Sequence, residues 1–350
     1  MRWRSAAGFA YSSRRPVDGL FPSPPTTRRV TRTVILHYGR ATLIACILLL
    51  HLPAAHSGQA RPIPLANGAQ GCLTLANLLG SIAVEDCAVV DFGIAGTGTV
   101  QHRPILIGDF PGTRTPPVDK RPARVLLLGG VHGDEYSAVS IQFRWAERLA
   151  RDSSRRYEWR MIPCLNPDGL LAGPATRTNA NGVDLNRNFP TLEWATRALP
   201  YWTEQTGRDP RRYPGPSAAS EPEVQWLVDE IERFDPDVIV SVHAPLGILD
   251  FDGPPPPPQQ LGMLNLDRLG AYPGSLGNYA GRTLAIPVLT PELQYAGIMP
   301  TNQQIAGMWD DLIEWLDEHI GEQDRVLPPR PVLPDWNLLL APPENLLLRP

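Results

Sequence analysis

Short apolar runs alternate with helix-like segments from residue 124 onward, and this alternation constrains the fold more than any other feature of the chain. The apolar runs are continuous, as in strands buried inside a sheet, and they cover residues 125–128, 238–242 and 286–289. The segments between them have an apolar face with helical spacing and predict helices at residues 136–150, 221–232 and 302–320. The pattern predicts an α/β fold with a mixed, mostly parallel central sheet flanked by helices, in a single domain.

The first 60 residues have the pattern of an export signal. Residues 1–40 contain eight Arg and one Asp, and an apolar run of 12 residues follows at 41–52. Small residues come next, so that cleavage is expected after Ser57 or Ala60. The apolar run is shorter than the roughly 20 residues that span a membrane. We therefore expect a signal peptide and a periplasmic or secreted protein, with an uncleaved inner-membrane anchor as the alternative.

The remaining chain divides into three parts. Residues 61–84 are expected to be an exported leader, and residues 85–322 are expected to form the main domain. Proline accounts for 39 of the 350 residues, and helix interiors and central strands reject it. Residues 323–350 are therefore assigned to a proline-rich C-terminal tail. Within and near the main domain, further strands are expected at residues 88–92, 99–107 and 159–162.

Charge and cysteine content narrow the classes of partner and of metal site. The formal net charge is -4, and because residues 1–40 carry +7 the rest of the chain carries -11. An acidic body argues against a nucleic-acid-binding surface. Cys72 and Cys87 would form a disulfide in an oxidising compartment, although two buried thiols fit equally well. Cys164 has no obvious partner, and without a Cys-x-x-Cys pair a thiolate zinc site is not expected.

Three residues at the ends of predicted strands have the chemistry of a metal site. His132 and Glu135 are three residues apart where the first apolar run turns into a helix, so both can face one ion. His243 directly follows the second apolar run and could supply a third ligand. Catalytic zinc takes nitrogen and oxygen ligands and keeps one position open. Any one of these residues alone is more often a capping or packing residue.

Other polar residues near strand ends have two interpretations. Glu292 follows the third apolar run and could be a general base, or a charge at a helix start. Arg177 and Arg187 could bind carboxylates in bidentate fashion, or could lie in a solvated loop of Asx turns. The residue pattern alone leaves these alternatives open.

Six motifs occur in the order found in zinc carboxypeptidases, and together they are highly specific. They are His132-Gly-Asp-Glu135, Asn166-Pro-Asp-Gly169, residues 182–189, residues 220–223, Ser241-Val-His243 and Thr290-Pro-Glu292. The chain resembles this family over roughly residues 85–322. Residues 177–190 and 272–277 resemble in particular its bacterial murein peptide amidase branch.

The resemblance implies roles around one Zn²⁺ per chain. His132, Glu135 and His243 would be the zinc ligands, and Asp184 would orient His132. Glu292 would be the general base and acid that acts on water and on the leaving amine.

The resemblance also implies how a substrate is held. Arg177 would stabilise the oxyanion, and Asn186 and Arg187 would bind the free carboxylate of the substrate. Digestive members of the family cover the substrate with a tyrosine, for which Tyr272 and Tyr279 are the candidates in this chain.

The implied function is that of an exported zinc metallopeptidase. It would hydrolyse a C-terminal peptide or γ-D-glutamyl-diaminopimelate amide bond, with murein peptides as the expected substrate. An N-acyl amino acid deacylase of the aspartoacylase or succinylglutamate desuccinylase type is the alternative, since those enzymes share the His-x-x-Glu, a distant His and an Asn-Arg pair. A non-catalytic peptide-binding module would be expected to lack Glu292 or a zinc ligand, and all of these are present.

Overall fold

The structure is a computed structural model that describes residues 68–95, 98–118, 120–321 and 323–324. These residues belong to one compact unit of the chain, Gln59–Pro350. The expected signal segment, residues 61–67 of the expected leader and residues 325–350 of the tail lie outside the described residues. Within the described part, none of the helices has the length and apolar character needed to cross a membrane.

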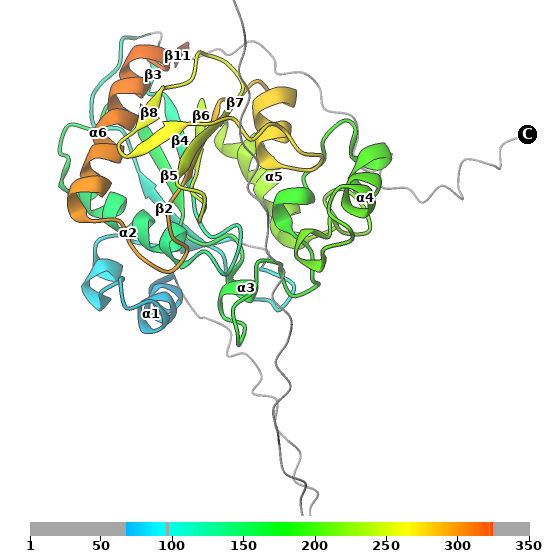
Figure 1. The fold of residues 1–350 in the computed structure, drawn as a ribbon. Coiled ribbons are helices and arrows are strands. Elements are labelled where there is room, and N and C mark those ends of the chain that lie inside the picture. Colours follow the sequence, from blue (N-terminus) through cyan, green and yellow to red (C-terminus); the bar gives the residue numbers. More distant parts are fainter. Residues whose placement is uncertain (1–67, 96–97, 119, 322, 325–350) are drawn as a thin grey trace, which may run out of the picture. The chain divides into compact units, whose positions relative to one another are not determined.

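A nine-stranded mixed sheet forms the centre of the described unit (Figure 1). Its order is β1-β2-β5-β4-β6-β10-β7-β9-β8. The strands are β1 (Gly93–Ile94), β2 (Leu106–Phe110), β4 (Arg124–Leu128), β5 (Glu158–Ile162), β6 (Val238–Ser241), β7 (Ile248–Asp252), β8 (Gln260–Leu261), β9 (Leu264–Leu266) and β10 (Val288–Glu292). The four central strands β5, β4, β6 and β10 are parallel, and β2 and β7 pair antiparallel at the two sides of this group. The predicted mixed sheet is confirmed, with its parallel part in the middle.

Helices cover both faces of this sheet. They are α1 (Gly68–Leu78), α2 (Tyr136–Arg151), α3 (Pro167–Leu170), α4 (Trp194–Glu204), α5 (Pro222–Phe234) and α6 (Asn302–His319). Short helical turns are η1 (Val84–Ala88), η2 (Leu185–Arg187), η3 (Pro210–Arg212) and the π-helix η4 (Gly277–Thr283). Strands β3 (Lys120–Arg121) and β11 (Gln323–Asp324) pair separately.

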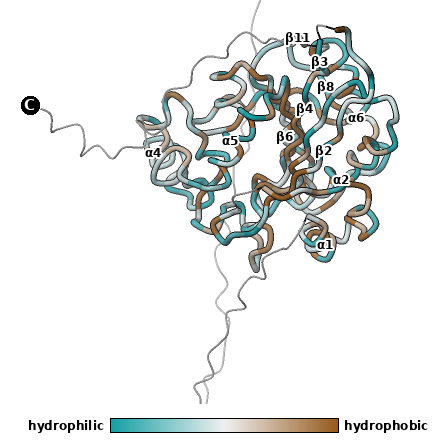
Figure 2. Tube along the Cα trace, turned by 180° about the vertical axis from the view of Figure 1, so that it is seen from behind, coloured by the Kyte–Doolittle hydropathy of each residue, from teal (hydrophilic) through white to brown (hydrophobic). Residues whose placement is uncertain are grey.

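The alternation of side chains along β4 divides the core into two layers. Val125 and Leu127 point into a core shared with α1, α2 and α6, whereas Leu126 and Leu128 point into a core shared with α5 and η4. All four side chains are fully buried, which explains why this strand is a continuous apolar run. The central strands are accordingly the most hydrophobic part of the trace in Figure 2.

The N-terminal part of the described chain is built differently from the sequence-based expectation. The prediction of a strand at residues 88–92 is wrong, because the end of η1 and a loop lie there. The Asp86 carboxylate stabilises this turn: it accepts a hydrogen bond from the Ala83 amide and pairs with Arg144. The strand expected at residues 99–107 begins only at Leu106. Residues 99–103 instead turn around Asp168, whose carboxylate accepts hydrogen bonds from the Thr99 hydroxyl and from a backbone amide.

A disulfide joins α1 to η1. Cys72 and Cys87 are bonded, with Cα atoms 5.7 Å apart, so the disulfide interpretation holds over two buried thiols. Cys164 is free and buried. Leu75 and Leu79 carry this region into the core beside α2, so residues 68–82 are packed against the sheet.

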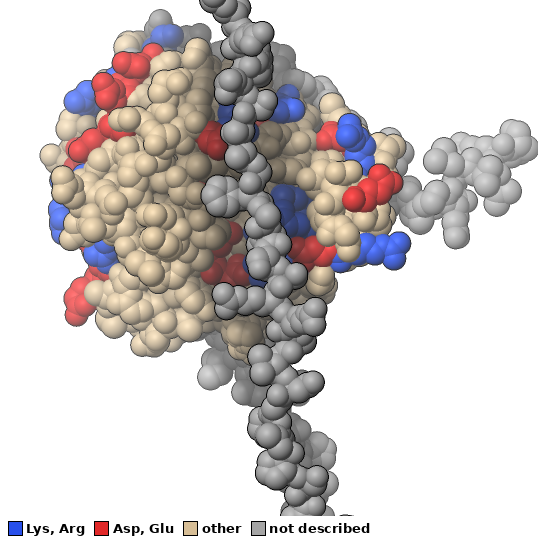
Figure 3. Space-filling view, in the orientation of Figure 1, with Lys and Arg blue, Asp and Glu red and all other residues tan. Residues whose placement is uncertain are grey.

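Charges of both signs are distributed over the surface. Figure 3 shows acidic and basic side chains interspersed on one face, without an extended area of a single sign.

Candidate metal centre

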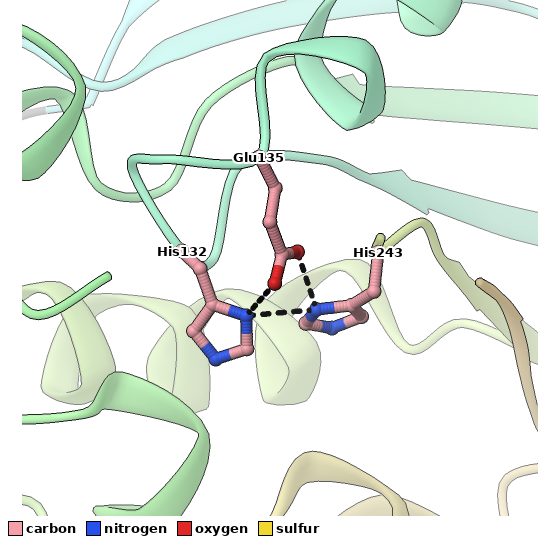
Figure 4. A group of neighbouring side chains, drawn as sticks. All are labelled: His132, Glu135 and His243. Atoms are coloured by element: carbon pink, nitrogen blue, oxygen red, sulfur yellow. Dashed lines mark hydrogen bonds and ion pairs between the residues drawn. The ribbon is translucent and has the colours of Figure 1, made fainter. Parts of the chain in front are cut away.

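Two parallel strands bring the three predicted ligands together. β4 and β6 are neighbours, His132 lies just after β4, His243 follows β6, and Glu135 is the residue before the first turn of α2. Ends of parallel strands at the same edge of a sheet are the usual place for ligand-binding residues in α/β folds. Figure 4 shows the three side chains pointing toward one another.

The donor atoms lie at hydrogen-bonding distances from each other. His132 Nδ1 is 2.7 Å from Glu135 Oε1, and His243 Nδ1 is 3.0 Å from Glu135 Oε2. The two Nδ1 atoms are 3.1 Å apart, and all three side chains are buried. The candidate ligand atoms lie within 4.8 Å of one another.

This donor set fits zinc. Two imidazole nitrogens and a carboxylate oxygen are ligands that zinc prefers, whereas calcium and magnesium favour oxygen alone. Three protein ligands are also the number that catalytic zinc sites use. Burial alone would raise the pKa of Glu135, but the interactions and hydrogen bonds of this carboxylate with the imidazoles of His132 and His243 outweigh it, so the pKa lies far below its usual range and the carboxylate is ionised.

Asp184 orients one of the imidazoles. Its Oδ1 atom is 3.1 Å from His132 Nε2, and because a carboxylate can only accept, the ring donates from Nε2 and leaves the Nδ1 lone pair facing the centre. The second oxygen accepts a hydrogen bond from Arg177 Nε at 3.0 Å. Burial favours the neutral acid, yet the charge of Arg177 and the hydrogen bond from His132 hold the pKa of Asp184 well below its usual range.

Ser241 contacts the other imidazole, and the sequence interpretation gave it no separate role. Its hydroxyl is 3.2 Å from His243 Nε2. The signal in the sequence is the spacing, because residues two apart on a strand project from the same face. Nδ1 of His243 thereby remains directed at Glu135.

Glu292 stands beside the metal centre on the next strand. The backbone of His243 forms hydrogen bonds with the two residues that flank Glu292. The His243 amide donates to the Pro291 carbonyl at 2.9 Å, and the His243 carbonyl accepts from the Leu293 amide at 2.8 Å. Among the described residues, Glu292 Oε2 is buried without a hydrogen-bond partner. Burial raises the pKa of this carboxyl. The geometry thus places a desolvated, basic oxygen next to the centre.

Arg177 also faces the centre. In addition to its bond to Asp184, its guanidinium lies 3.5 Å from Glu135 Oε1. It brings a fixed positive charge to the side of the three candidate ligands.

Asn186 and Arg187 lie on η2, which the Asp184 carboxylate caps by accepting a hydrogen bond from the Asn186 amide at 3.0 Å. Asn186 Oδ1 accepts a hydrogen bond from the Leu276 amide at 2.9 Å. Arg187 is buried, and its Nε has no hydrogen-bond partner among the described residues. Burial accordingly lowers the pKa of Arg187. Its guanidinium is a cation without a paired carboxylate in this part of the chain.

Of the two candidate tyrosines, Tyr272 lies at this site. Its ring centroid is 4.6 Å from the Arg187 guanidinium carbon. Tyr279 is buried in the core and stacks on Phe189.

Comparison with known proteins agrees with this geometry. The family model described as zinc carboxypeptidase matches residues 93–246. Murein peptide amidase A of Escherichia coli is 42% identical over 127 residues, which cover 36% of this chain and 50% of that protein. Murein peptide amidase A of Vibrio campbellii is 34% identical over 183 residues, or 49% of this chain and 69% of that protein.

The matched part therefore spans about half the length of the E. coli relative. Among solved structures, carboxypeptidase A of Helicoverpa armigera superposes with a TM-score of 0.50 at 18% identity, covering 70% of this chain and 71% of that one. This likeness shows a shared fold.

Proposed function

The chain belongs to the zinc carboxypeptidase family, and from this premise we propose that it is a zinc-dependent peptidase acting on murein peptides. The bond cleaved is a C-terminal peptide bond or the γ-D-glutamyl-diaminopimelate amide bond. The observation that carries the proposal is the convergence of His132, Glu135 and His243 beside Glu292. The likeness to murein peptide amidases supports the substrate class.

His132, Glu135 and His243 would hold the zinc, which when bound lowers the pKa of water and polarises a carbonyl. Glu292 takes the proton from the attacking water and delivers it to the leaving amine, a role that suits a carboxyl with a raised pKa and an unpartnered oxygen. Arg177 places its positive charge where the carbonyl oxygen becomes negative.

The free carboxylate of the substrate binds at Arg187 and Asn186. A guanidinium that is buried without a carboxylate partner has donors available for one. Tyr272 lies against this guanidinium and is the candidate to cover the bound residue.

Export of the protein is part of the proposal. It rests on the basic flank, short apolar run and small-residue exit within residues 1–60. The disulfide between Cys72 and Cys87 supports it, since disulfides persist in oxidising compartments. Cell fractionation with mass determination of the mature chain separates a cleaved periplasmic or secreted protein from one anchored in the inner membrane.

The activity is tested with the zinc-loaded full chain and the peptide L-alanyl-γ-D-glutamyl-meso-diaminopimelate. We expect released diaminopimelate, loss of release with a chelator, and recovery when zinc is restored. Cleavage of ordinary C-terminal residues only would indicate a general carboxypeptidase. Cleavage of N-acyl amino acids instead would indicate a deacylase, and binding without hydrolysis would indicate a peptide-binding module.

A further inference from the structure

Asp250 lies on the same face of the sheet as the proposed general base. Strand β7 pairs antiparallel with β10, so that Asp250 is opposite Thr290 and Ile248 is opposite Glu292. Cross-strand partners and residues two apart share a face. Diagonal neighbours in such a pair are roughly 7–8 Å apart, which places Asp250 within reach of a side chain bound beside Glu292.

The Asp250 carboxylate is only half satisfied by the protein. Oδ1 accepts hydrogen bonds from the backbone amides of Phe251 at 2.9 Å and Leu269 at 3.1 Å. Among the described residues, none donates to Oδ2, and no Lys, Arg or His forms an ion pair with this carboxylate. The residue is 7% exposed. Buried carboxylates are normally paired with a cation.

The neighbouring acid on the same face of β7 differs in this respect. Asp252, one pair farther from Glu292, lies 3.4 Å from Arg282 and so has a cationic partner. The missing partner is therefore a property of Asp250 and not of the strand. Burial raises the pKa of both carboxyls, and the charge of Arg268 opposes this shift at each of them, so the contrast between the two acids lies in the ion pair of Asp252 with Arg282.

Asp250 also forms a hydrogen bond with the segment that carries Tyr272 and lies next to Arg187, the proposed binding site for the substrate carboxylate. The Leu269 amide that binds Asp250 is three residues before Tyr272, whose ring lies on Arg187. Asp250 thus lies between the strand that carries Glu292 and the segment that covers Arg187. The residue leaving in the proposed reaction has its amide at Glu292 and its carboxylate at Arg187, so its side chain extends over the same part of the sheet.

We infer that Asp250 binds an ammonium group on the side chain of the leaving residue, so that the site selects a diamino acid. The inference rests on the proposed function, because it assigns the leaving residue to that position. Oδ2 is the acceptor, while Oδ1 keeps its two backbone bonds. A charge-assisted hydrogen bond of this kind gives a preference of about 10- to 100-fold over a side chain without the amine.

The test compares two peptides that differ only in this amine: L-alanyl-γ-D-glutamyl-meso-diaminopimelate and the same peptide ending in 2-aminopimelate. We expect the wild-type chain to prefer the diamino peptide by about 10- to 100-fold in kcat/KM. In Asp250→Asn the ratio should fall to near one, with kcat/KM for the 2-aminopimelate peptide kept within about threefold. Asn retains the Oδ1 acceptor for the two backbone amides. Asp267→Asn, which removes an exposed carboxylate just after β9, should keep the wild-type ratio.

Calorimetric binding of free meso-diaminopimelate and of 2-aminopimelate to the zinc-loaded protein gives a readout without turnover. Tighter binding of the diamino acid by wild type, lost in Asp250→Asn, supports the inference even if neither peptide is cleaved, an outcome that would reject only the proposed hydrolysis. A wild-type enzyme that cleaves both peptides equally, or an Asp250→Asn variant that keeps the preference, overturns the inference and leaves the proposed hydrolysis standing. If Asp250→Asn does not fold, Asp250→Ser takes its place, and equal cleavage of both peptides by wild type overturns the inference without any variant.

Discussion

Single residues around the metal centre divide into those that would hold the ion and those that would act on the substrate. Glu292 belongs to the second group, because it is not one of the three residues whose ligand atoms converge and its buried Oε2 has no hydrogen-bond partner among the described residues. Glu292→Gln should lower kcat by about 10²- to 10⁴-fold, since the amide cannot accept a proton. Zinc content by elemental analysis should stay near one per chain. Activity close to wild type in this variant would contradict the role as base.

The variant His132→Ala, unlike Glu292→Gln, is expected to lose its zinc. It removes one of three ligand atoms, so zinc should be lost on dialysis, and activity should fall with it. Elemental analysis that still finds one zinc per chain would remove His132 from the ligand set.

Asp184 acts through its neighbour. In Asp184→Asn, the ring of His132 loses the carboxylate that fixes its tautomer, and zinc affinity should weaken about 10- to 100-fold. Competition with a chromophoric chelator measures this. The matched control is Asp109→Asn, since Asp109 pairs with Arg160 from β2, two strands away from β4, and its zinc affinity should equal that of wild type. Equal affinity in both variants would argue against an orienting role.

At the scale of elements, the N-terminus of α5 is attached to the loop that carries Arg177 and Asp184. Asn179 in this loop donates to Glu221 at 2.7 Å and to Glu223 at 3.1 Å. Both acids are buried. The helix thereby holds the loop in place, and the raised pKa of Glu223 makes this support sensitive to pH.

Glu223 should make stability fall as pH rises. Burial is the main cause that raises its pKa to about 7, against 4.5 for the ordinary group. The neutral acid is therefore favoured in the folded chain. Its contribution to the free energy of unfolding is fully present below about pH 4.5 and is lost as the pH rises through about 7. The difference between the two pKa values corresponds to about 3 kcal/mol. Urea unfolding at pH 5 and pH 8 should show that Glu223→Gln gains stability relative to wild type at the higher pH. Glu232→Gln, exposed on the same helix, should show no such gain, and parallel curves for all three proteins would reject the assignment.

The sequence predicts elements well where the pattern is local. The helices at residues 136–150, 221–232 and 302–320 and the first two central strands are confirmed because their burial follows their own periodicity. The strand expected at residues 286–289 lies instead at Val288–Glu292, so that Glu292 is the last residue of the strand. The sequence pattern does not identify β7, since Asp250 and Asp252 alternate with its apolar residues and break the continuous apolar run, and a run of five prolines follows. The convergence of His132, Glu135 and His243 is predictable because the first two lie between an apolar run and the helix after it, and His243 directly follows the next apolar run. Contacts of Tyr272 with Arg187 and of Ser241 with His243 depend on tertiary packing and on side-chain direction.

At the scale of the whole described unit, the disulfide and the metal centre lie on opposite faces of the central sheet. Cys72 and Leu75 lie in the core on the α2 and α6 face, whereas His243 and Ser241 project from the face of β6 that carries the α5 core. Loss of the disulfide should therefore reduce global stability without changing the metal centre.

The double variant Cys72→Ser/Cys87→Ser tests this separation. Closing a 15-residue loop is worth about 3 kcal/mol in the unfolded chain, so the free energy of unfolding should fall by about that amount. Zinc affinity and kcat/KM, measured well below the melting temperature, should stay within about threefold of wild type. A reducing agent should destabilise wild type to the same extent and leave the double variant unchanged, which controls for the serines. A large loss of zinc affinity would show instead that α1 holds α2, and with it Glu135, in place, because α1 contacts the core beside that helix.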